Sequence, residues 1–255
     1  MRIALDQHGD VGTRCGRILL GERRLTALGL IDKSPTGSDD RLHTVRDLSG
    51  YDVIVTDATE DASAVVESAL EAGIGCVVFA DGDDLEGDYG KAFAAADLSL
   101  LLGANLATGV APCLASHETA HGGEILDVTI AWTEPGSPIR RGEAIAFPDP
   151  VGARWARARQ TEAGYEAFVA PVHGEWAAAM ARVTSAVESG VVTRIVGVAD
   201  LAAYLEAIAL AAGALTLGAF SPGAHRPAAA AEPYLSAALE AGLEVAAYTI
   251  ASPRE

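Results

Sequence analysis

Five consecutive residues near the middle of the chain have the types and spacing of a zinc site. His117, Glu118 and His121 form H-E-x-x-H, in which two histidines bind zinc and the glutamate is the general base of a peptidase. Gly122 and Gly123 end the predicted helix directly after the second histidine, and catalytic zinc also needs a third protein ligand farther along. We therefore keep a zinc metallopeptidase only as a less favoured alternative and predict no metal site.

A second group of residues could bind a dinucleotide. Gly9 and Gly12 lie between an apolar stretch and a helical one, where backbone N–H groups at a helix start bind a diphosphate. The first glycine of the usual pattern is replaced by Asp6 or Gln7, depending on the alignment, and a carboxylate there would repel phosphate. The predicted cofactor-binding residues of this turn are Gly9, Asp10, Val11 and Gly12.

Asp32 bears on which cofactor would bind. It follows the second predicted strand, 20 residues after Gly12, where an acid commonly binds the ribose 2′-hydroxyl and disfavours a 2′-phosphate. The sequence therefore predicts NAD or NADP as cofactor, with NAD preferred.

An arginine-rich segment, residues 132–159, reads as a long polar loop in an otherwise acidic chain. Guanidinium groups bind carboxylates in two-pronged geometry, so this segment could orient a small acid, although arginines that merely balance surface charge are the alternative. It contains Arg140, Arg141, Arg154, Arg157 and Arg159, of which we assign Arg140, Arg141 and Arg154 to the substrate. Possible proton donors or acceptors are His173, the first choice, Glu134 and Asp149.

The elements that would position these residues fall into two patterns. Up to residue 104, short apolar runs alternate with helical stretches, which predicts a Rossmann-like parallel sheet in an α/β protein. From 105 to 255, alternating strands and a hairpin at 187–190 predict an α+β domain, mainly an antiparallel sheet covered by helices. The segment from about 231 to 255 could pack back on the first domain. Residues 201–220 predict a buried helix, and 225–233 a linker.

Composition excludes several partners. The formal net charge of −17 repels nucleic acid and anionic membrane surfaces, so a small-molecule substrate is the expected partner. Three widely spaced cysteines and an amino terminus without an apolar leader fit the cytoplasm.

Two stretches, "TDATEDASAVVESALEAG" and "LLGANLATGVAPCLA", resemble two-domain dehydrogenases of amino-acid metabolism. This group includes dihydrodipicolinate reductase, homoserine dehydrogenase and saccharopine dehydrogenase. The resemblance implies that Asp57-Ala58-Thr59 passes beside the nicotinamide and that Asn105 and Gly109 lie at the hinge near the ring. By this analogy Ala58, Thr59 and Asn105 bind cofactor, and Gly109 lies at the substrate.

The same resemblance implies a homodimer or homotetramer. Dihydrodipicolinate reductases carry paired histidines followed by a lysine in the second domain. After residue 124 this chain has only the isolated His173 and His225, and its two lysines, Lys33 and Lys91, lie in the first half. We therefore expect an NAD(P)-dependent oxidoreductase acting on a small amino- or oxo-acid. The alternative is a non-catalytic ligand-binding or scaffold protein with a degenerate Rossmann fold.

Overall fold

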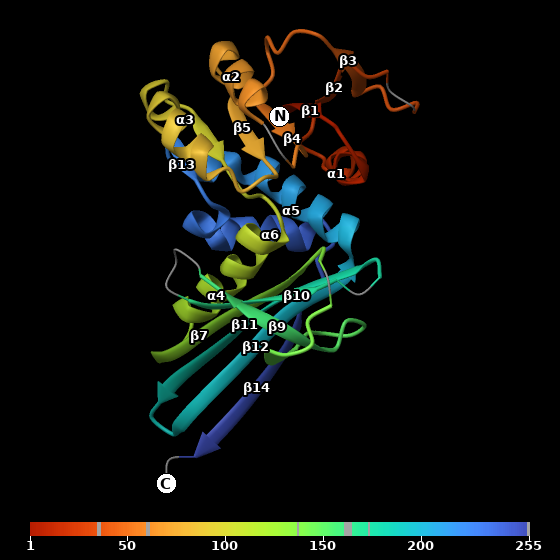
Figure 1. Cartoon of the computed structure of the whole chain (residues 1–255). Helices are drawn as coiled ribbons and strands as arrows, with labels where there is room; N and C mark the ends of the chain where they lie inside the picture. The colour runs from red at the N-terminus through yellow and green to blue at the C-terminus, as the bar shows by residue number, and fades with distance from the viewer. Residues whose placement is uncertain (35–36, 60–61, 137, 161–164, 173, 254–255) are drawn as a thin grey trace.

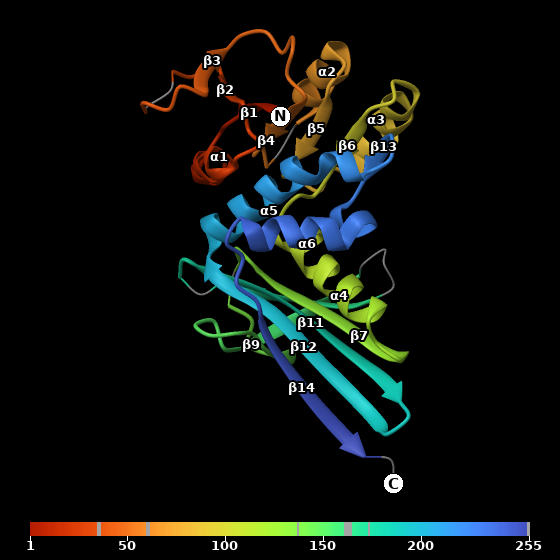
Figure 2. The same cartoon turned by 180° about the vertical axis from the view of Figure 1, so that it is seen from behind.

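The computed structural model describes residues 1–34, 37–59, 62–136, 138–160, 165–172 and 174–253. Within these residues two seven-stranded sheets lie one above the other, with helices between them (Figures 1 and 2). We call the first sheet with its helices the first lobe, and the second sheet the second lobe. The amino terminus lies in the first lobe, and the carboxyl terminus lies at the far end of the second (Figure 1).

The first sheet is entirely parallel, in the order β13-β6-β5-β4-β1-β2-β3. This confirms the Rossmann-like sheet predicted from the continuous apolar runs. Because β6 leads through η1 into α4, which packs on the second sheet, the carboxyl ends of the strands face the second lobe. The strands are β1 (Arg2–Asp6), β2 (Ala27–Ile31), β3 (Leu42–Val45), β4 (Val53–Thr56), β5 (Gly75–Val78), β6 (Ser99–Leu101) and β13 (Gly223–His225).

Three helices accompany these strands: α1 (Asp10–Gly21), α2 (Ser63–Ala72) and α3 (Asp83–Ala95). The buried residues of α1, which are Gly12, Cys15, Gly16 and Leu19, recur every three or four positions, so one face of the helix packs on the core. Helix α2 ends at Gly73, whose φ of 69° is left-handed backbone that glycine adopts without strain.

The second sheet is mixed, in the order β14-β12-β11-β7-β10-β9-β8. Its pairs are antiparallel except β10 with β7, which run parallel, and β11 and β12 form the predicted hairpin. The strands are β7 (Glu124–Glu134), β8 (Glu143–Ala146), β9 (Ala153–Arg159), β10 (Glu166–Pro171), β11 (Trp176–Val187), β12 (Gly190–Leu201) and β14 (Ala246–Pro253).

Helices between the sheets join the two lobes: η1 (Leu106–Val110, a π-helix), α4 (Ala111–Ala120), α5 (Ala202–Thr216) and α6 (Ala231–Glu240). Helix α5 packs on the first sheet through Leu210 and on the second through Ile208. The 202–219 window is long and apolar enough to cross a membrane, yet 61% of it is buried inside the protein. That burial confirms the predicted core helix.

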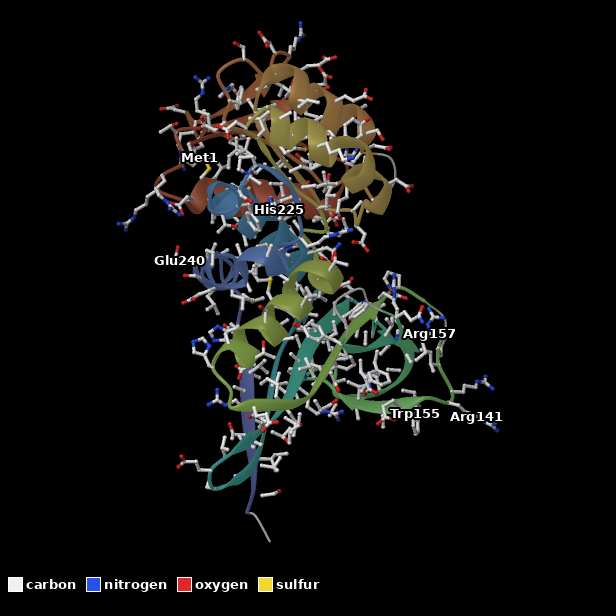
Figure 3. The ribbon with its side chains drawn as sticks, turned by 90° about the vertical axis from the view of Figure 1, so that its left-hand side faces the viewer. Met1, Arg141, Trp155, Arg157, His225 and Glu240 are labelled. Carbon is white, nitrogen blue, oxygen red and sulfur yellow. The ribbon has the colours of Figure 1, made fainter. Side chains whose placement is uncertain are left out.

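Three expectations about elements were wrong. The segment 132–159 is not a long loop: it contains the end of β7 and all of β8 and β9, because Ile145, Phe147 and Ala156 face a core under the sheet. The segment 225–233 is not a linker, since it holds the end of β13, a 3-10 turn at Pro227–Ala230 and the start of α6. Figure 3 shows the labelled His225 within the first lobe. Strand β10, expected to be antiparallel, pairs with β7 in parallel.

Candidate functional site

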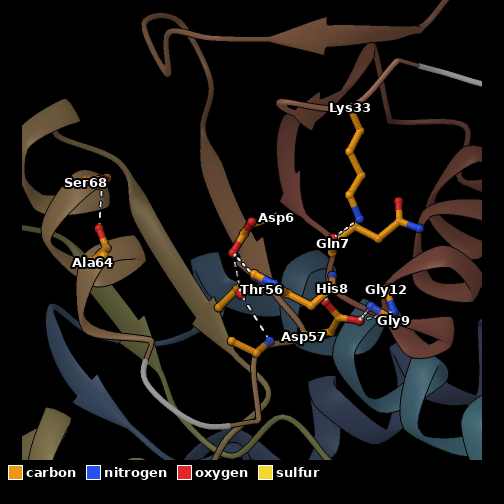
Figure 4. Close-up of polar contacts among 11 residues, drawn as sticks. Asp6, Gln7, His8, Gly9, Gly12, Lys33, Thr56, Asp57, Ala64 and Ser68 are labelled. Carbon is orange, nitrogen blue, oxygen red and sulfur yellow. Dashed lines mark hydrogen bonds and ion pairs between the residues drawn. The ribbon is translucent and has the colours of Figure 1, made fainter.

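The turn between β1 and α1 is organised by one carboxylate from a neighbouring strand. Asp57 directly follows β4, which pairs with β1, and its side chain accepts hydrogen bonds from three backbone N–H groups of the turn (Figure 4). His8 N lies 2.5 Å from Oδ1, while Gly9 N and Gly12 N lie 2.9 and 2.7 Å from Oδ2. Asp57 is 5% exposed and Gly12 is buried, whereas His8 and Gly9 are exposed.

Gly12 has the residue type that this carboxylate requires. A Cβ atom at Gly12 would lie 2.7 Å from Oδ2 of Asp57 and 2.8 Å from its Cγ, closer than van der Waals contact permits. The glycine that lets a helix pack closely in dinucleotide-binding units here makes room for an acidic side chain.

The turn keeps two further donors. The backbone N–H groups of Asp10 and Val11, in the first turn of α1, have no acceptor among the residues that the structure describes. The first N–H groups of a helix need acceptors from outside it and carry its positive end. They border a cleft of about 550 Å³ lined by His8, Gly9, Asp10, Val11, Asp57, Ala58, Thr59 and Phe79. Most of the predicted cofactor residues are therefore brought together in one cleft.

Neither residue at the missing-glycine position fills this cleft. The Asp6 carboxylate accepts hydrogen bonds from Thr56 Oγ1 at 2.9 Å and pairs with His8 Nε2 at 2.7 Å. The Gln7 side chain is hydrogen-bonded to Thr13.

Two residues after β2 lie near this turn. Asp32 has left-handed backbone at φ 53°, and its side chain is exposed and hence accessible to a ligand hydroxyl. Lys33 donates to the backbone oxygen of Gln7 and so places a positive charge beside the turn (Figure 4).

The connection from β6 through Asn105 and η1 into the second lobe, which we call the hinge, is contacted by a titratable residue that sequence analysis missed. Asn105 donates from Nδ2 to Phe79 O at 2.8 Å and accepts from Thr108 N at 2.9 Å, which caps η1. Glu206, on α5, accepts from Leu106 N at 2.7 Å. Burial raises the pKa of Glu206 to about 7, and the Leu106 hydrogen bond opposes that rise. No local sequence signal marked Glu206, because its partner is 100 residues away.

Gly109 lies in η1 itself. A Cβ atom there would lie 2.8 Å from the Tyr234 hydroxyl, so this glycine allows α6 to approach η1. Its position fits close packing of the hinge, and contact with a substrate stays a prediction.

A cluster of charged side chains lies on the face of the second sheet that is turned toward the first lobe. Arg157 Nη2 and Arg159 Nη1 lie 3.3 and 3.0 Å from the two carboxylate oxygens of Glu134. Arg159 also lies over the ring of Trp132, 5.7 Å from its centroid. Trp132 belongs to the same buried core as Leu106 of η1, and β7 contacts η1, so the cluster lies on the side of the sheet that faces the hinge. Two guanidinium groups share one carboxylate, so the cluster carries a net positive charge.

The three arginines assigned to the substrate lie elsewhere on this sheet. Arg154 faces the opposite side of β9 from Arg157 and Arg159, because side chains alternate along a strand. Arg140 and Arg141 are exposed, and Figure 3 shows Arg141 at the outer edge of the sheet while Arg157 lies nearer the first lobe. Asp149 precedes a cis proline, Pro150. His173 lies outside the described residues.

The two histidines of H-E-x-x-H lie together, with ring centroids 4.6 Å apart, but the glutamate between them has a different environment. Glu118 is 9% exposed, and its carboxylate lies 3.4 Å from Arg194 Nη1, whereas His117 and His121 are exposed at the end of α4. His121 Nδ1 lies 2.8 Å from the backbone oxygen of His117. Among the described residues, no group of three or more histidine, cysteine or acidic side chains is placed to hold a metal ion.

Comparisons with solved structures establish the fold over nearly the whole chain. The chain matches apo saccharopine dehydrogenase (L-Glu forming) from Saccharomyces cerevisiae with a TM-score of 0.69 and 8% identity, covering 98% of this chain and 100% of that one. It matches dipicolinate-bound dihydrodipicolinate reductase from Paenisporosarcina sp. TG-14 with a TM-score of 0.53 and 10% identity, covering 89% and 97%. It matches an engineered D-amino acid dehydrogenase bound to NADP+ with a TM-score of 0.52 and 12% identity, covering 89% and 93%.

These matches confirm the predicted resemblance in fold to the saccharopine dehydrogenase and dihydrodipicolinate reductase group. No protein-family profile matches the chain, and no curated protein matches it in sequence. At identities of 8 to 12% the likeness concerns architecture, so the chemistry must be argued from the residues.

Proposed function

We propose that this chain is an NAD(P)-dependent oxidoreductase that transfers hydride to or from a small amino- or oxo-acid. The observation that carries the proposal is the pair of open N–H groups, Asp10 and Val11, at the positive end of α1 beside a cleft of about 550 Å³. This cleft lies at the carboxyl ends of the parallel strands β1, β4 and β5, where α/β proteins bind their ligands. The matched saccharopine dehydrogenase, and the reductase and dehydrogenase that hold dipicolinate and NADP+, favour the same class.

The residues present fit a dinucleotide. Asp10 and Val11 would donate to the diphosphate, Asp32 would accept from a ribose hydroxyl, and Thr59 and Asn105 lie on the way to the hinge. The cofactor would supply the hydride, and the protein would supply position and charge. NAD is preferred by the Asp32 argument, while Lys33 beside the turn makes NADPH a necessary arm of any test.

We assign the acidic group of the substrate to the cluster of Arg157 and Arg159. Their shared carboxylate, Glu134, leaves one positive charge in excess, and the cluster lies on the side of the sheet that faces the hinge. Arginine binds carboxylates through paired hydrogen bonds, and dipicolinate in the matched reductase is a small dicarboxylate. Proton transfer by His173 or Glu134 remains part of the proposal.

The test is binding followed by turnover. NADH and NADPH are titrated separately into the protein by calorimetry, and amino acids and 2-oxo acids are then screened for change in nicotinamide absorbance at 340 nm, the usual reporter wavelength. Binding of either cofactor with turnover of one acid supports the proposal. Absence of binding at about millimolar cofactor, weaker than about −4 kcal/mol, would overturn it.

A second candidate, a non-catalytic protein with a degenerate Rossmann fold, is favoured by one observation. Two carboxylates, Asp6 and Asp57, lie at a turn where dinucleotide-binding units hold phosphate. Cofactor binding without turnover of any acid, or no cofactor binding at all, would favour this candidate.

A further inference from the structure

We call residues 8–12, between β1 and the first turn of α1, the glycine turn. Its backbone N–H donors divide into two sets. His8, Gly9 and Gly12 donate to the Asp57 carboxylate, and Asp10 and Val11 have no acceptor among the described residues. We call the first set the inner donors and the second set the outer donors. The cleft beside the turn is lined by His8, Gly9 and Asp57 as well as by Asp10 and Val11. One carboxylate therefore satisfies the inner donors and leaves the outer ones free.

Two effects of Asp57 on a diphosphate can be distinguished. As a competitor, its carboxylate would occupy the diphosphate site and would have to leave when cofactor binds. As a brace, it would remain in place and hold the turn in the shape that presents the outer donors. Burial of Asp57 at 5% exposed, with three hydrogen bonds and the room that Gly12 provides, favours the brace. If this carboxylate left, the buried N–H group of Gly12 and the partly buried N–H groups of His8 and Gly9 would lose their acceptor.

We propose that Asp57 is a positioning residue that fixes the glycine turn for the cofactor, whose diphosphate is then bound by the N–H groups of Asp10 and Val11. This inference rests on the proposed function. It assigns Asp57 the structural task that the missing first glycine performs elsewhere, which is to set the shape of the turn. The Asp57 charge is offset by three N–H dipoles and by the positive end of α1, which reduces its repulsion of phosphate.

The first experiment uses the unmodified protein. Backbone amide resonances and hydrogen exchange are recorded by NMR without ligand, with NADH and with NADPH. We expect Gly9 and Gly12 amides to be protected without ligand and to stay so, while the Asp10 and Val11 amide resonances move on binding. If the Gly9 and Gly12 amides lose their carboxylate acceptor when cofactor binds, Asp57 is a competitor and the inference fails. If neither cofactor moves any resonance, the proposed function itself fails.

The second experiment compares two variants that each lose one backbone-bonded carboxylate. Asp57→Asn has one acceptor oxygen instead of two, so it cannot accept all three N–H groups. The matched control is Asp52→Asn, which removes the charge of a carboxylate that accepts one 2.7 Å hydrogen bond, from Arg2 N, at the other end of β4. We expect Asp57→Asn to raise the Kd for NADH by about tenfold or more, and the control to change it by less than about twofold.

A ligand fragment separates positioning from general loss of structure. Adenosine lacks the diphosphate, so its affinity should differ by less than about twofold between Asp57→Asn and the unmodified protein. Tighter NADH binding by Asp57→Asn would overturn the inference, as would equal weakening of NADH and adenosine. If Asp57→Asn does not fold, the NMR result on the unmodified protein decides.

Discussion

The glycine turn of the first lobe and the arginine cluster of the second are both built around one carboxylate, but they are held in opposite ways. Asp57 is 5% exposed and bonded to backbone, whereas Glu134, Arg159 and Arg157 have side chains that are 30, 51 and 69% exposed. Exposed ion pairs contribute little to folding, and buried charge-assisted bonds contribute much more. Changes at the turn should therefore affect stability, and changes in the cluster should mainly affect ligand binding.

The largest effect is expected for Gly12→Ala. The added Cβ would lie 2.7 Å from Asp57 Oδ2, so either the carboxylate or α1 must move and hydrogen bonds of the turn are lost. We expect a loss of about 3 kcal/mol in the free energy of unfolding, measured by urea denaturation.

The control for Gly12→Ala is the same substitution in a protein that lacks the Asp57 carboxylate. The three heavy atoms nearest the added Cβ all belong to Asp57, and alanine favours helix over glycine. In an Asp57→Ala background, Gly12→Ala should be neutral or should stabilise by up to about 1 kcal/mol. An equal loss in both backgrounds would show that Asp57 does not set the requirement for glycine.

A smaller effect is expected at Glu206, on helix α5 between the two sheets. Burial raises its pKa to about 7 in the folded protein from 4.5 in the unfolded chain, so the folded state binds the extra proton between these values. The stabilisation from this group is fully present below about pH 4.5 and is lost as the pH rises through 7. Over this range the free energy of unfolding should fall by about 2 kcal/mol.

The measurement is the free energy of unfolding from pH 4.5 to 8 for the unmodified protein and for Glu206→Gln. Glutamine keeps an oxygen for the Leu106 N–H group but does not titrate. The difference between the two proteins should therefore grow in favour of the variant as the pH rises. A difference that does not depend on pH would show that Glu206 titrates normally.

Most elements of the first lobe could be predicted because their signals are local, but β13, whose end fell in the expected linker, could not. Apolar runs with helices between them specify a parallel sheet, and Gly9 and Gly12 mark the turn whatever the rest of the chain does. The role of Asp57 could not be predicted in the same way. It depends on β4 pairing with β1, which joins residues 45 or more positions apart, and the sequence alone does not state that pairing.

The second lobe was harder to predict because its strands carry mixed signals. Strand β9 has three arginines and one buried residue, Ala156, so the segment reads as a polar loop unless that alanine is known to face a core. For the same reason Arg154 could not be separated from Arg157 and Arg159 before the strand and its faces were known. The density of arginines indicated that residues 132–159 could bind an acid. Only the pairing of β9 with β10 showed that Arg157 and Arg159 share one face of the strand.

The smallest effect on folding is expected in the arginine cluster. Arg159→Ala removes one exposed partner of Glu134 and the contact with Trp132, so the free energy of unfolding should fall by less than about 1 kcal/mol. The same change should weaken binding of a small dicarboxylate, with dipicolinate as the probe in the presence of NADH. We expect about a tenfold rise in Kd, because a charge-assisted hydrogen bond is lost.

Arg154→Ala is the matched control for the cluster, since it removes the same charge from the opposite face of β9. It should change the Kd for dipicolinate by less than about twofold, apart from the general effect of net charge, which about 0.2 M salt largely screens. Equal weakening by both variants at that salt would mean that charge alone, and not position on the sheet, attracts the acid. The contrast between a turn set by backbone and a cluster set by side chains would then hold for stability but not for ligand recognition.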